Sequence, residues 1–441
     1  MTDRSSARAF LAQVTDDFTE LPTPEGEWGP DGPLAWAGYD AARARARERT
    51  GEAESVVCGT GHVQGVRAVL LAFEFGYLGG SLGVRTGDRL EAAYGYARAH
   101  RLPVVPLVAT GGSRMQEGML ALTQLQRVAR QSALTRAAGL PQIAVLRDPT
   151  TGGGWATLGA GADVVLALPG AQVGFAGSRV RPPDADPAAY TAEAQVAAGA
   201  ADALVRPEDL RRTLGRWLRL LTSPAAEAPL PRHPGPPPAP GLPRTGWEAV
   251  QRARSPRRPR ADRYLDACFT HRVAISGDRC GGTDPGMLCG FGEHAGRTVA
   301  YAAQTGTATR PAGYRTAARL IRLADRLGIP VLTLVDTPGA ANDAEAERQG
   351  AGAAIADLFD AVATVRTPIT TLLIGEGGSG GALALAAPGA TWAAPDSYFS
   401  VIAPESAAAI LKRPPEETAA TADHLRLRPQ DLAELGVIRT D

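Results

Sequence analysis

Residues 102–112 read LPVVPLVATGG, and residues 329–339 read IPVLTLVDTPG. Each stretch is an apolar run of strand length that ends in a glycine-containing turn. A second pair follows at the same separation of 227 residues, since residues 141–153 read PQIAVLRDPTTGG and residues 368–380 read PITTLLIGEGGSG. Two strand-and-turn matches at one separation indicate that the chain contains an internal duplication.

Each half places a segment of helix length between its two strands. Residues 115–138 and 344–365 have the length and the apolar spacing of amphipathic helices. Strands that alternate with helices predict an α/β fold. Both halves also end in a proline followed by acidic residues, RPEDL at 206–210 and RPQDL at 428–432, which is typical of the first turn of a helix.

A proline-rich segment separates the two halves. Residues 223–244 read SPAAEAPLPRHPGPPPAPGLPR, which offers too few backbone donors for a helix or a central strand and favours an extended spacer. A chain of 441 residues is long enough for two domains that each bury a core. The sequence therefore predicts a first domain over residues 1–222, a linker over 223–244 and a second domain over 245–441.

The composition limits the partners. The 46 basic and 46 acidic side chains cancel, so no field of the whole protein would recruit nucleic acid or an anionic membrane. The four cysteines form no CxxC pair and the six histidines are scattered, so we expect neither a zinc site nor disulfides. No apolar stretch approaches the roughly 18 residues of a membrane span, and we expect a cytoplasmic protein.

The glycine turns are the candidate site. Gly112 and Gly153 lie 41 residues apart in the first half, as do Gly339 and Gly380 in the second. Turns at the carboxyl ends of neighbouring strands are where α/β sheets bind ligands. Glycine allows close approach of the backbone, so N–H groups from the two turns can converge on one oxygen. Such an oxyanion hole would stabilise the enolate of a thioester.

These glycines also allow simpler interpretations. They can serve only to close tight turns, although four turns in a duplicated pattern favour a shared function. The DTPG of residues 336–339 resembles a nucleotide switch, but no G-x-x-x-x-G-K-[ST] loop accompanies it.

A nucleophile elbow is a further alternative. Residues 377–381, GGSGG, fit the G-x-S-x-G pattern, and Asp396 and His424 follow in the order of a hydrolase triad. The counterpart in the first half, residues 150–154, reads TTGGG and has no serine. We therefore expect Ser379 to be a turn residue.

Several longer stretches identify a family. The first half carries FEFGYLGGSLG at 73–83, GGSRMQEG at 111–118, DPTTGG at 148–153 and VGFAGSR at 173–179. The second half carries WEAVQRARSP at 247–256, GDR at 277–279, GYRTAAR at 313–319, DTPGA at 336–340, IGEGGSGGALA at 374–384 and YFSVIAPE at 398–405. With these motifs the first half resembles the beta subunit, and the second half the alpha subunit, of bacterial acetyl-CoA carboxylase carboxyltransferase.

The resemblance implies two tandem crotonase-like (ClpP/crotonase) domains in one chain. It implies that the first half binds an acyl-CoA thioester and that the second half binds carboxybiotin. The implied donors to the thioester oxygen are the N–H groups of Gly112, Ser113 and Gly153, with Gly111, Gly152 and Arg114 as substrate contacts. The implied donors to the ureido oxygen of biotin are those of Gly339, Ala340, Gly380 and Gly381, with Gly378 beside them. Arg114 is equally compatible with a solvated or helix-pairing arginine.

The resemblance also implies the chemistry and the partners. Carboxybiotin releases CO2, the biotin anion removes the α-proton, and the enolate attacks CO2, so no side-chain nucleophile is needed. Lys412, the single lysine, lies in LKRP, so the biotin must be carried by a separate carrier protein and charged by a separate biotin carboxylase. In the family the site forms between protomers, which implies a homodimer or larger homo-oligomer. The implied product is malonyl-CoA for fatty acid or polyketide biosynthesis.

The chain departs from the family pattern at three places. The four-cysteine zinc module of many beta subunits is absent from this sequence, and residues 304–310 (QTGTATR) replace a longer basic segment of the alpha subunits. Ala341, Asn342 and Asp343 stand where an aromatic residue and a proline are usual. These departures leave two alternatives open: a decarboxylase or transcarboxylase that acts on malonyl thioesters, and a non-catalytic scaffold subunit.

Overall fold

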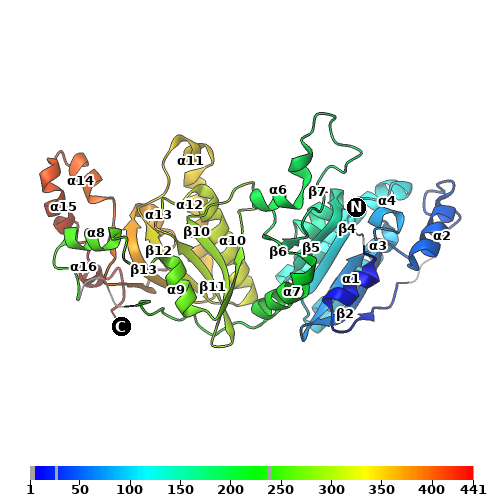
Figure 1. The fold of residues 1–441 in the computed structure, drawn as a ribbon, viewed down its shortest axis with the longest axis horizontal. Coiled ribbons are helices and arrows are strands. Elements are labelled where there is room, and N and C mark those ends of the chain that lie inside the picture. Colours follow the sequence, from blue (N-terminus) through cyan, green and yellow to red (C-terminus); the bar gives the residue numbers. More distant parts are fainter. Residues whose placement is uncertain (1–4, 25–27, 236–240, 441) are drawn as a thin grey trace. The chain divides into compact units, whose positions relative to one another are not determined.

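The computed structural model describes residues 5–24, 28–235 and 241–440 (Figure 1). The chain divides into two compact units. The first runs to Thr222 and includes Arg279–Gly281, and the second consists of Ser223–Asp278 and the chain from Gly282 onward. Both units are built from a mixed β-sheet with helices, which confirms the predicted α/β class.

The first unit contains one sheet with the strand order β1-β2-β3-β4-β5-β6-β8, and β7 pairs with β5. Its strands are β1 (Thr19–Glu20), β2 (Val56–Val63), β3 (Val66–Phe73), β4 (Val104–Thr110), β5 (Ile143–Thr151), β6 (Val164–Ala167), β7 (Val173–Gly174) and β8 (Ala203–Leu204). Its helices are α1 (Ala7–Val14), α2 (Tyr39–Thr50), α3 (Val84–His100), α4 (Gly118–Ala137), α5 (Gly152–Gly154), α6 (Ala192–Ala197) and α7 (Pro207–Thr222).

The second unit repeats this plan with the strand order β14-β13-β12-β11-β10-β9, and β15 pairs with β13. Its strands are β9 (His271–Ile275), β10 (Met287–His294), β11 (Arg297–Gln304), β12 (Val331–Thr337), β13 (Ile369–Gly378), β14 (Thr391–Ala393) and β15 (Tyr398–Ser400). Its helices are α8 (Gly246–Arg254), α9 (Ala261–Cys268), α10 (Pro311–Leu327), α11 (Ala344–Arg348), α12 (Ala351–Thr364), α13 (Ser379–Leu383), α14 (Pro404–Ile410), α15 (Thr418–His424) and α16 (Pro429–Glu434).

The duplication extends to the strand register. In each unit an antiparallel hairpin, β2–β3 or β10–β11, is followed by parallel strands. Leu107 pairs with Val145 between β4 and β5, and Leu334 pairs with Leu372 between β12 and β13. Both residues of the second pair lie 227 positions after those of the first. The repeat seen in the sequence is therefore a repeat of the fold.

The central strands are buried on both faces, which explains why they read as continuous apolar runs rather than alternating ones. Every residue of β4 and every residue of β12 is buried. In the first unit, helices α3 and α4 pack against one another, and in the second unit α10 packs against α12. The two glycine turns of each unit follow these buried strands.

The predicted helices are confirmed, with one interruption. The segment 115–138 contains α4, whereas the segment 344–365 is divided into α11 and α12. The break occurs at Gly350, which has φ of +77° and therefore leaves the helical conformation. Helices α7 and α16 begin at Pro207 and Pro429, as the proline signals predict.

The proline-rich segment begins as part of the second unit. Thr298 N–H donates to the Ser223 carbonyl (2.8 Å), Ala225 N–H donates to the Thr298 carbonyl (2.9 Å), and Ala228 is buried in the core of that unit. Residues 236–240 of the predicted linker lie outside the described residues. The predicted domain boundaries stay a prediction.

The cysteines differ in their access to solvent, which gives a testable prediction. Burial raises the pKa of the Cys58 and Cys289 thiols to about 12, and Cys280 is exposed. Because the thiolate is the nucleophile, we expect iodoacetamide at pH 8 to label Cys280 first and to leave Cys58 and Cys289 unlabelled until the protein is unfolded. Mass spectrometry of peptides checks this, and fast native labelling of Cys58 would contradict it.

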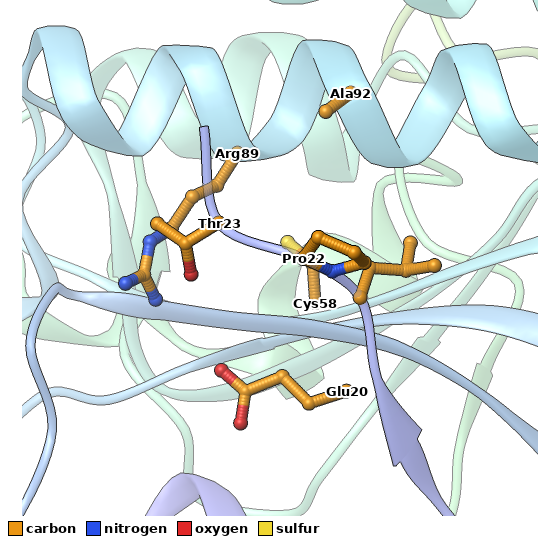
Figure 2. Close-up of a pocket in the computed structure, with 7 residues that line it drawn as sticks. Glu20, Pro22, Thr23, Cys58, Arg89 and Ala92 are labelled. Atoms are coloured by element: carbon orange, nitrogen blue, oxygen red, sulfur yellow. The ribbon is translucent and has the colours of Figure 1, made fainter. Parts of the chain in front are cut away.

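Cys58 also lines a small pocket of the first unit, between strand β2, helix α3 and the segment after β1. Figure 2 shows the Cys58 sulfur beside Pro22, with Arg89 to the left and Glu20 below. The pocket is lined by Glu20, Leu21, Pro22, Thr23, Cys58, Arg89 and Ala92. None of these residues belongs to a glycine turn, so this pocket is separate from the predicted site. Within the described chain, no helix has the length and apolar character needed to cross a membrane.

Candidate functional site

The two glycine turns of the first unit lie side by side. The turn after β4 contains Gly112, with φ of +110°, and the turn after β5 leads into α5 at Gly152, with φ of +63°. A Cβ atom built on Gly152 would lie 3.1 Å from the Gly112 Cα atom. The structure thus brings together the two turns that the sequence predicts as one site.

Of four backbone N–H groups at these two turns, two are occupied and two are free. Gly112 N–H donates to the Thr110 hydroxyl oxygen (3.1 Å), and Gly152 N–H donates to the Phe175 carbonyl (3.0 Å). Ser113 N–H has no hydrogen-bond partner within residues 5–24, 28–235 and 241–440. Gly153 lies in the first turn of α5, where N–H groups lack intrahelical acceptors. Of the predicted donors, Ser113 and Gly153 are therefore the unoccupied ones.

The second unit has the same arrangement of turns. A Cβ atom on Gly378 would lie 1.9 Å from the Pro338 carbonyl oxygen, and one on Gly381 would lie 2.5 Å from the Ala340 nitrogen. The turn after β12 and the start of α13 are therefore in contact. Gly380 lies in the first turn of α13, is exposed, and has open space around it.

The hydrogen bonds around the turns repeat at the separation of 227 residues. Leu82 N–H donates to the Gly112 carbonyl and Thr309 N–H donates to the Gly339 carbonyl. Gly339 N–H donates to the Thr337 hydroxyl oxygen (3.1 Å), as Gly112 N–H does to Thr110. Ala340 N–H has no partner within the described parts of the chain, like Ser113. In each unit, therefore, a glycine donates its N–H to the threonine two residues before it, and the N–H of the residue directly after that glycine is free.

The two units differ in what covers the helix start. A Cβ atom on Gly153 would lie 2.3 Å from Leu125 Cδ2, so the side chain of Leu125 covers that turn. Nothing lies within 4 Å of such an atom on Gly380. The second turn is therefore open to a bulkier group than the first.

A buried carboxylate ties together the two turns of the second unit. The Asp336 side chain is fully buried and accepts hydrogen bonds from Arg258 Nη2 (2.6 Å), Arg260 Nη1 (3.1 Å) and the N–H of Glu376 (3.1 Å). Asp336 is the penultimate residue of β12 and Glu376 lies near the end of β13, so one carboxylate fixes the spacing of both strand ends. Arg258 and Arg260 lie outside the motifs that predicted the site from the sequence. The available signal was an aspartate inside an otherwise apolar strand, which requires a buried partner.

Arg114, the predicted substrate contact, lies in the interior of the first unit and is paired with other side chains there. Its side chain is buried and donates to Glu54 Oε1 (2.5 Å), Tyr39 Oη (3.2 Å) and Glu117 Oε1 (3.4 Å). Burial alone would raise the pKa of the Glu54 carboxyl, but the Arg114 guanidinium outweighs this and holds that pKa below its usual range. Arg114 thus belongs to a buried ionic network beneath the turn, which the sequence does not distinguish from an exposed arginine.

The alternative hydrolase triad is not assembled. Ser379 is exposed with φ of +59°, at the position equivalent to Gly152. Asp396 lies beside His233, with 3.5 Å between Oδ2 and Nε2. His424 is exposed and its Nδ1 donates to the Ala420 carbonyl (2.7 Å), and no hydrogen bond or ion pair joins it to Asp396 among the described residues. Ser379 therefore lacks the histidine and aspartate pair that a nucleophile of this kind needs.

The last residue of the shortened segment 304–310 forms an ion pair that is not evident from the sequence. Arg310 donates through both Nη atoms to the Asp343 carboxylate, at 3.1 Å each. Asp343 also caps α11 by accepting from Ala346 N–H (3.0 Å). This pair joins the two segments in which the chain departs from the alpha-subunit pattern. Within the described residues, no group of three or more His, Cys, Asp or Glu side chains is placed to hold a metal ion.

Two family descriptions match the chain. The family described as "Carboxyl transferase domain" matches residues 25–202. The family described as "Acetyl co-enzyme A carboxylase carboxyltransferase-like" matches residues 244–440. The matches follow the two halves of the duplication.

Curated relatives match over nearly the whole chain. "Acetyl-coenzyme A carboxylase carboxyl transferase subunits beta/alpha" of Salinispora arenicola (strain CNS-205) is 41% identical over 469 residues, which cover 99% of this chain and 81% of the relative. "Probable biotin-dependent acyl-coenzyme A carboxylase beta3 subunit" of Mycobacterium bovis (strain ATCC BAA-935 / AF2122/97) is 36% identical and covers 91% of this chain and 82% of the relative.

Solved structures share the fold. A transcarboxylase 12S crystal structure with hydrolysed methylmalonyl-coenzyme A superimposes with a TM-score of 0.80 at 20% identity, covering 98% of this chain and 86% of its own. A single-chain, multi-domain long-chain acyl-CoA carboxylase gives a TM-score of 0.75 at 20% identity, covering 99% of this chain and 44% of its own. These likenesses confirm the predicted fold of two tandem crotonase-like domains.

Proposed function

The chain belongs to the carboxyltransferase family of biotin-dependent acyl-CoA carboxylases, and from this premise we propose that its acceptor is acetyl-CoA and its product malonyl-CoA. In the proposed reaction the bond between the biotin nitrogen and the carboxyl carbon breaks. A proton moves from the acetyl α-carbon to that nitrogen, and a bond forms between the α-carbon and CO2. Carboxybiotin on a separate carrier protein is the second substrate and supplies both the CO2 and the base.

The observation that carries this proposal is the paired set of free N–H groups. Ser113 and Gly153 present them in the first unit, and Ala340 and Gly380 present them in the second. We propose that the first pair binds the thioester oxygen and stabilises the enolate, and that the second binds the ureido oxygen of biotin. Backbone donors that are fixed before the reaction stabilise developing charge without reorganisation, and each is worth about 3 kcal/mol.

Among the described residues, Asp396 and His424 do not join Ser379 in a triad, which supports a reaction without a side-chain nucleophile. The chain's own residues then act by binding and orienting two substrates. The open space at Gly380 supports placing the ureido ring in the second unit, and the covered turn at Gly153 supports placing the narrow acyl group in the first. We further propose a cytoplasmic homo-oligomer that receives carboxybiotin from a carrier charged by a separate biotin carboxylase.

The test is carboxyl transfer with the purified chain, followed in reverse as the biotin-dependent conversion of malonyl-CoA to acetyl-CoA. Turnover that requires biotin, and that prefers malonyl-CoA to methylmalonyl-CoA, supports the proposal. Turnover of malonyl-CoA without biotin would contradict the proposal and indicate a decarboxylase instead. No turnover and no binding of any acyl-CoA would favour the scaffold subunit.

Replacing Ser379 distinguishes this function from an esterase. We expect Ser379→Ala to keep kcat within about twofold, because no histidine activates the hydroxyl. The same assay of malonyl-CoA turnover measures the effect, with hydrolysis of p-nitrophenyl acetate as the comparison. A loss of several orders of magnitude in both activities would point to a nucleophile instead.

A further inference from the structure

We infer that the hydroxyl groups of Thr110 and Thr337 are positioning groups that select which backbone N–H of each glycine turn is presented to substrate. This inference rests on the proposed function and deepens it, because it assigns the donors to Ser113 and Ala340. Neither threonine is predicted to touch a substrate. Each acts through the peptide that follows it.

In the first unit the hydroxyl lies inside the turn. Thr110 is fully buried at the end of β4, and its Oγ1 accepts from Gly112 N–H at 3.1 Å. The Gly112 carbonyl is held by Leu82 N–H (2.9 Å), and Leu82 also accepts through its own carbonyl from Arg114 N–H (2.9 Å). Both polar groups of Gly112 are therefore occupied, and so is the N–H of Arg114. Between them, the N–H of Ser113 is left free.

In the second unit the same contacts recur 227 positions later. Thr337 is fully buried, and its Oγ1 accepts from Gly339 N–H at 3.1 Å. Thr309 N–H holds the Gly339 carbonyl (3.1 Å), and Ala341 N–H donates to the Thr309 carbonyl (2.9 Å). The Thr337 hydroxyl is also within donor distance of the Thr307 carbonyl (2.8 Å). Ala340 N–H is the group left free here.

The recurrence of these hydrogen bonds in both units indicates a shared function rather than ordinary packing of a turn. The side chains around the two turns differ, since Pro338 stands in place of Gly111 and Ala340 in place of Ser113. The hydroxyl acceptor, the glycine and the free N–H are the parts that both units keep. A hydroxyl that binds the glycine N–H restricts the rotation of that peptide, and this restriction fixes the position of the next N–H along the chain. A displacement of about 1 Å in such a donor costs on the order of 100-fold in rate.

Valine is the matched replacement, because it keeps the shape of threonine and removes the hydroxyl. In both turns this removes the acceptor of the glycine N–H. In the second turn it also removes a donor that lies 2.8 Å from the Thr307 carbonyl and 2.7 Å from the Gly339 carbonyl. We expect Thr110→Val and Thr337→Val each to lower kcat for biotin-dependent malonyl-CoA turnover by about 10- to 100-fold. Thr110→Ser and Thr337→Ser keep the hydroxyl and should restore kcat to within about threefold. Thr333→Val removes a buried hydroxyl from the same strand β12, where it hydrogen-bonds to the Thr371 hydroxyl (2.7 Å), and should leave kcat unchanged.

A spectroscopic measurement tells positioning from general loss of structure. In the wild type, the carbonyl stretch of bound acetyl-CoA labelled with ¹³C at the thioester carbon should shift to lower frequency. So should the ureido stretch of bound ¹³C-labelled biotin. Thr110→Val should abolish the thioester shift and leave the ureido shift, and Thr337→Val should do the reverse.

Each outcome decides the inference. Loss of the shift in the matching unit alone, with rescue by serine, supports it. Wild-type rates and shifts in both valine variants would overturn it while the proposed function stands. Equal loss in Thr333→Val would also overturn it, because any buried hydroxyl would then matter. A wild type that binds neither acetyl-CoA nor biotin would overturn the proposed function together with the inference.

Discussion

Gly378→Ala should reduce carboxyl transfer by at least about 100-fold while most of the fold is kept. A Cβ atom at this position would lie 1.9 Å from the Pro338 carbonyl oxygen and 2.7 Å from the Gly339 nitrogen. Both neighbours are backbone atoms, so the turn after β12 must move away. That movement would displace Ala340 and Gly380, the two proposed donors to the ureido oxygen. The turnover of malonyl-CoA with biotin measures the loss.

The control for this prediction is a glycine whose replacement meets little resistance. A Cβ atom on Gly95, in the middle of α3, would have only Arg98 Nη2 near it, at 4.0 Å, and alanine is the better helix former. We expect Gly95→Ala to keep full activity. Circular dichroism and thermal melting show whether Gly378→Ala remains folded. If the Gly378→Ala protein is folded and has the wild-type kcat, the glycine turns of the second unit do not take part in the reaction.

The fold could be predicted from the sequence because its strongest signals are local and repeated. The apolar runs that became β4 and β12 are buried along their whole length, and continuous runs of that kind indicate a parallel sheet covered on both faces. Both strand pairs have the same separation in the sequence, and this indicated the duplication. The duplication reappears in the strand register, where Leu107 pairs with Val145 and Leu334 pairs with Leu372. The interruption of the helix at Gly350 could also have been predicted, since glycine is the residue that most readily ends a helix.

The site was predicted at the level of turns and not of atoms. Sequence spacing placed Gly112 beside Gly152, but it could not show that Thr110 occupies the Gly112 N–H. That outcome depends on the dihedral angles of three consecutive residues. It also could not show that the turns differ. Thr151 stands in the first unit where the second has Gly378, and only the positions of the neighbouring backbone reveal that a side chain fits at one and not at the other.

Arg114→Met should destabilise the first unit by about 3–5 kcal/mol. The substitution leaves the carboxylates of Glu54 and Glu117 buried, with side chains 2% and 0% exposed, after removal of the cation that pairs with both. Hydrogen bonds from Tyr39 and Val84 to Glu117, and from Ser55 N–H to Glu54, remain in the variant. The ion pairs with Arg114, however, no longer offset the desolvation of the two carboxylates. Urea unfolding followed by circular dichroism measures the change. Arg127→Met is the matched control in the same unit, because its ion pairs with Asp88 and Glu91 are both partly exposed and should each be worth about 1 kcal/mol or less.

The pH dependence of the two proteins should have opposite signs. In the wild type the pKa of Glu54 is held below its usual range, so this pair stabilises the fold above the pKa of the unfolded glutamate. That contribution is lost as the pH falls through the lower, folded-state value. In Arg114→Met the unpaired Glu54 carboxyl is favoured in its protonated form by burial, so acidification towards pH 4 should narrow the difference between the variant and the wild type. If Arg114→Met instead kept wild-type stability at every pH and raised only the KM for malonyl-CoA, the guanidinium would be a substrate contact and the buried network would have to be abandoned.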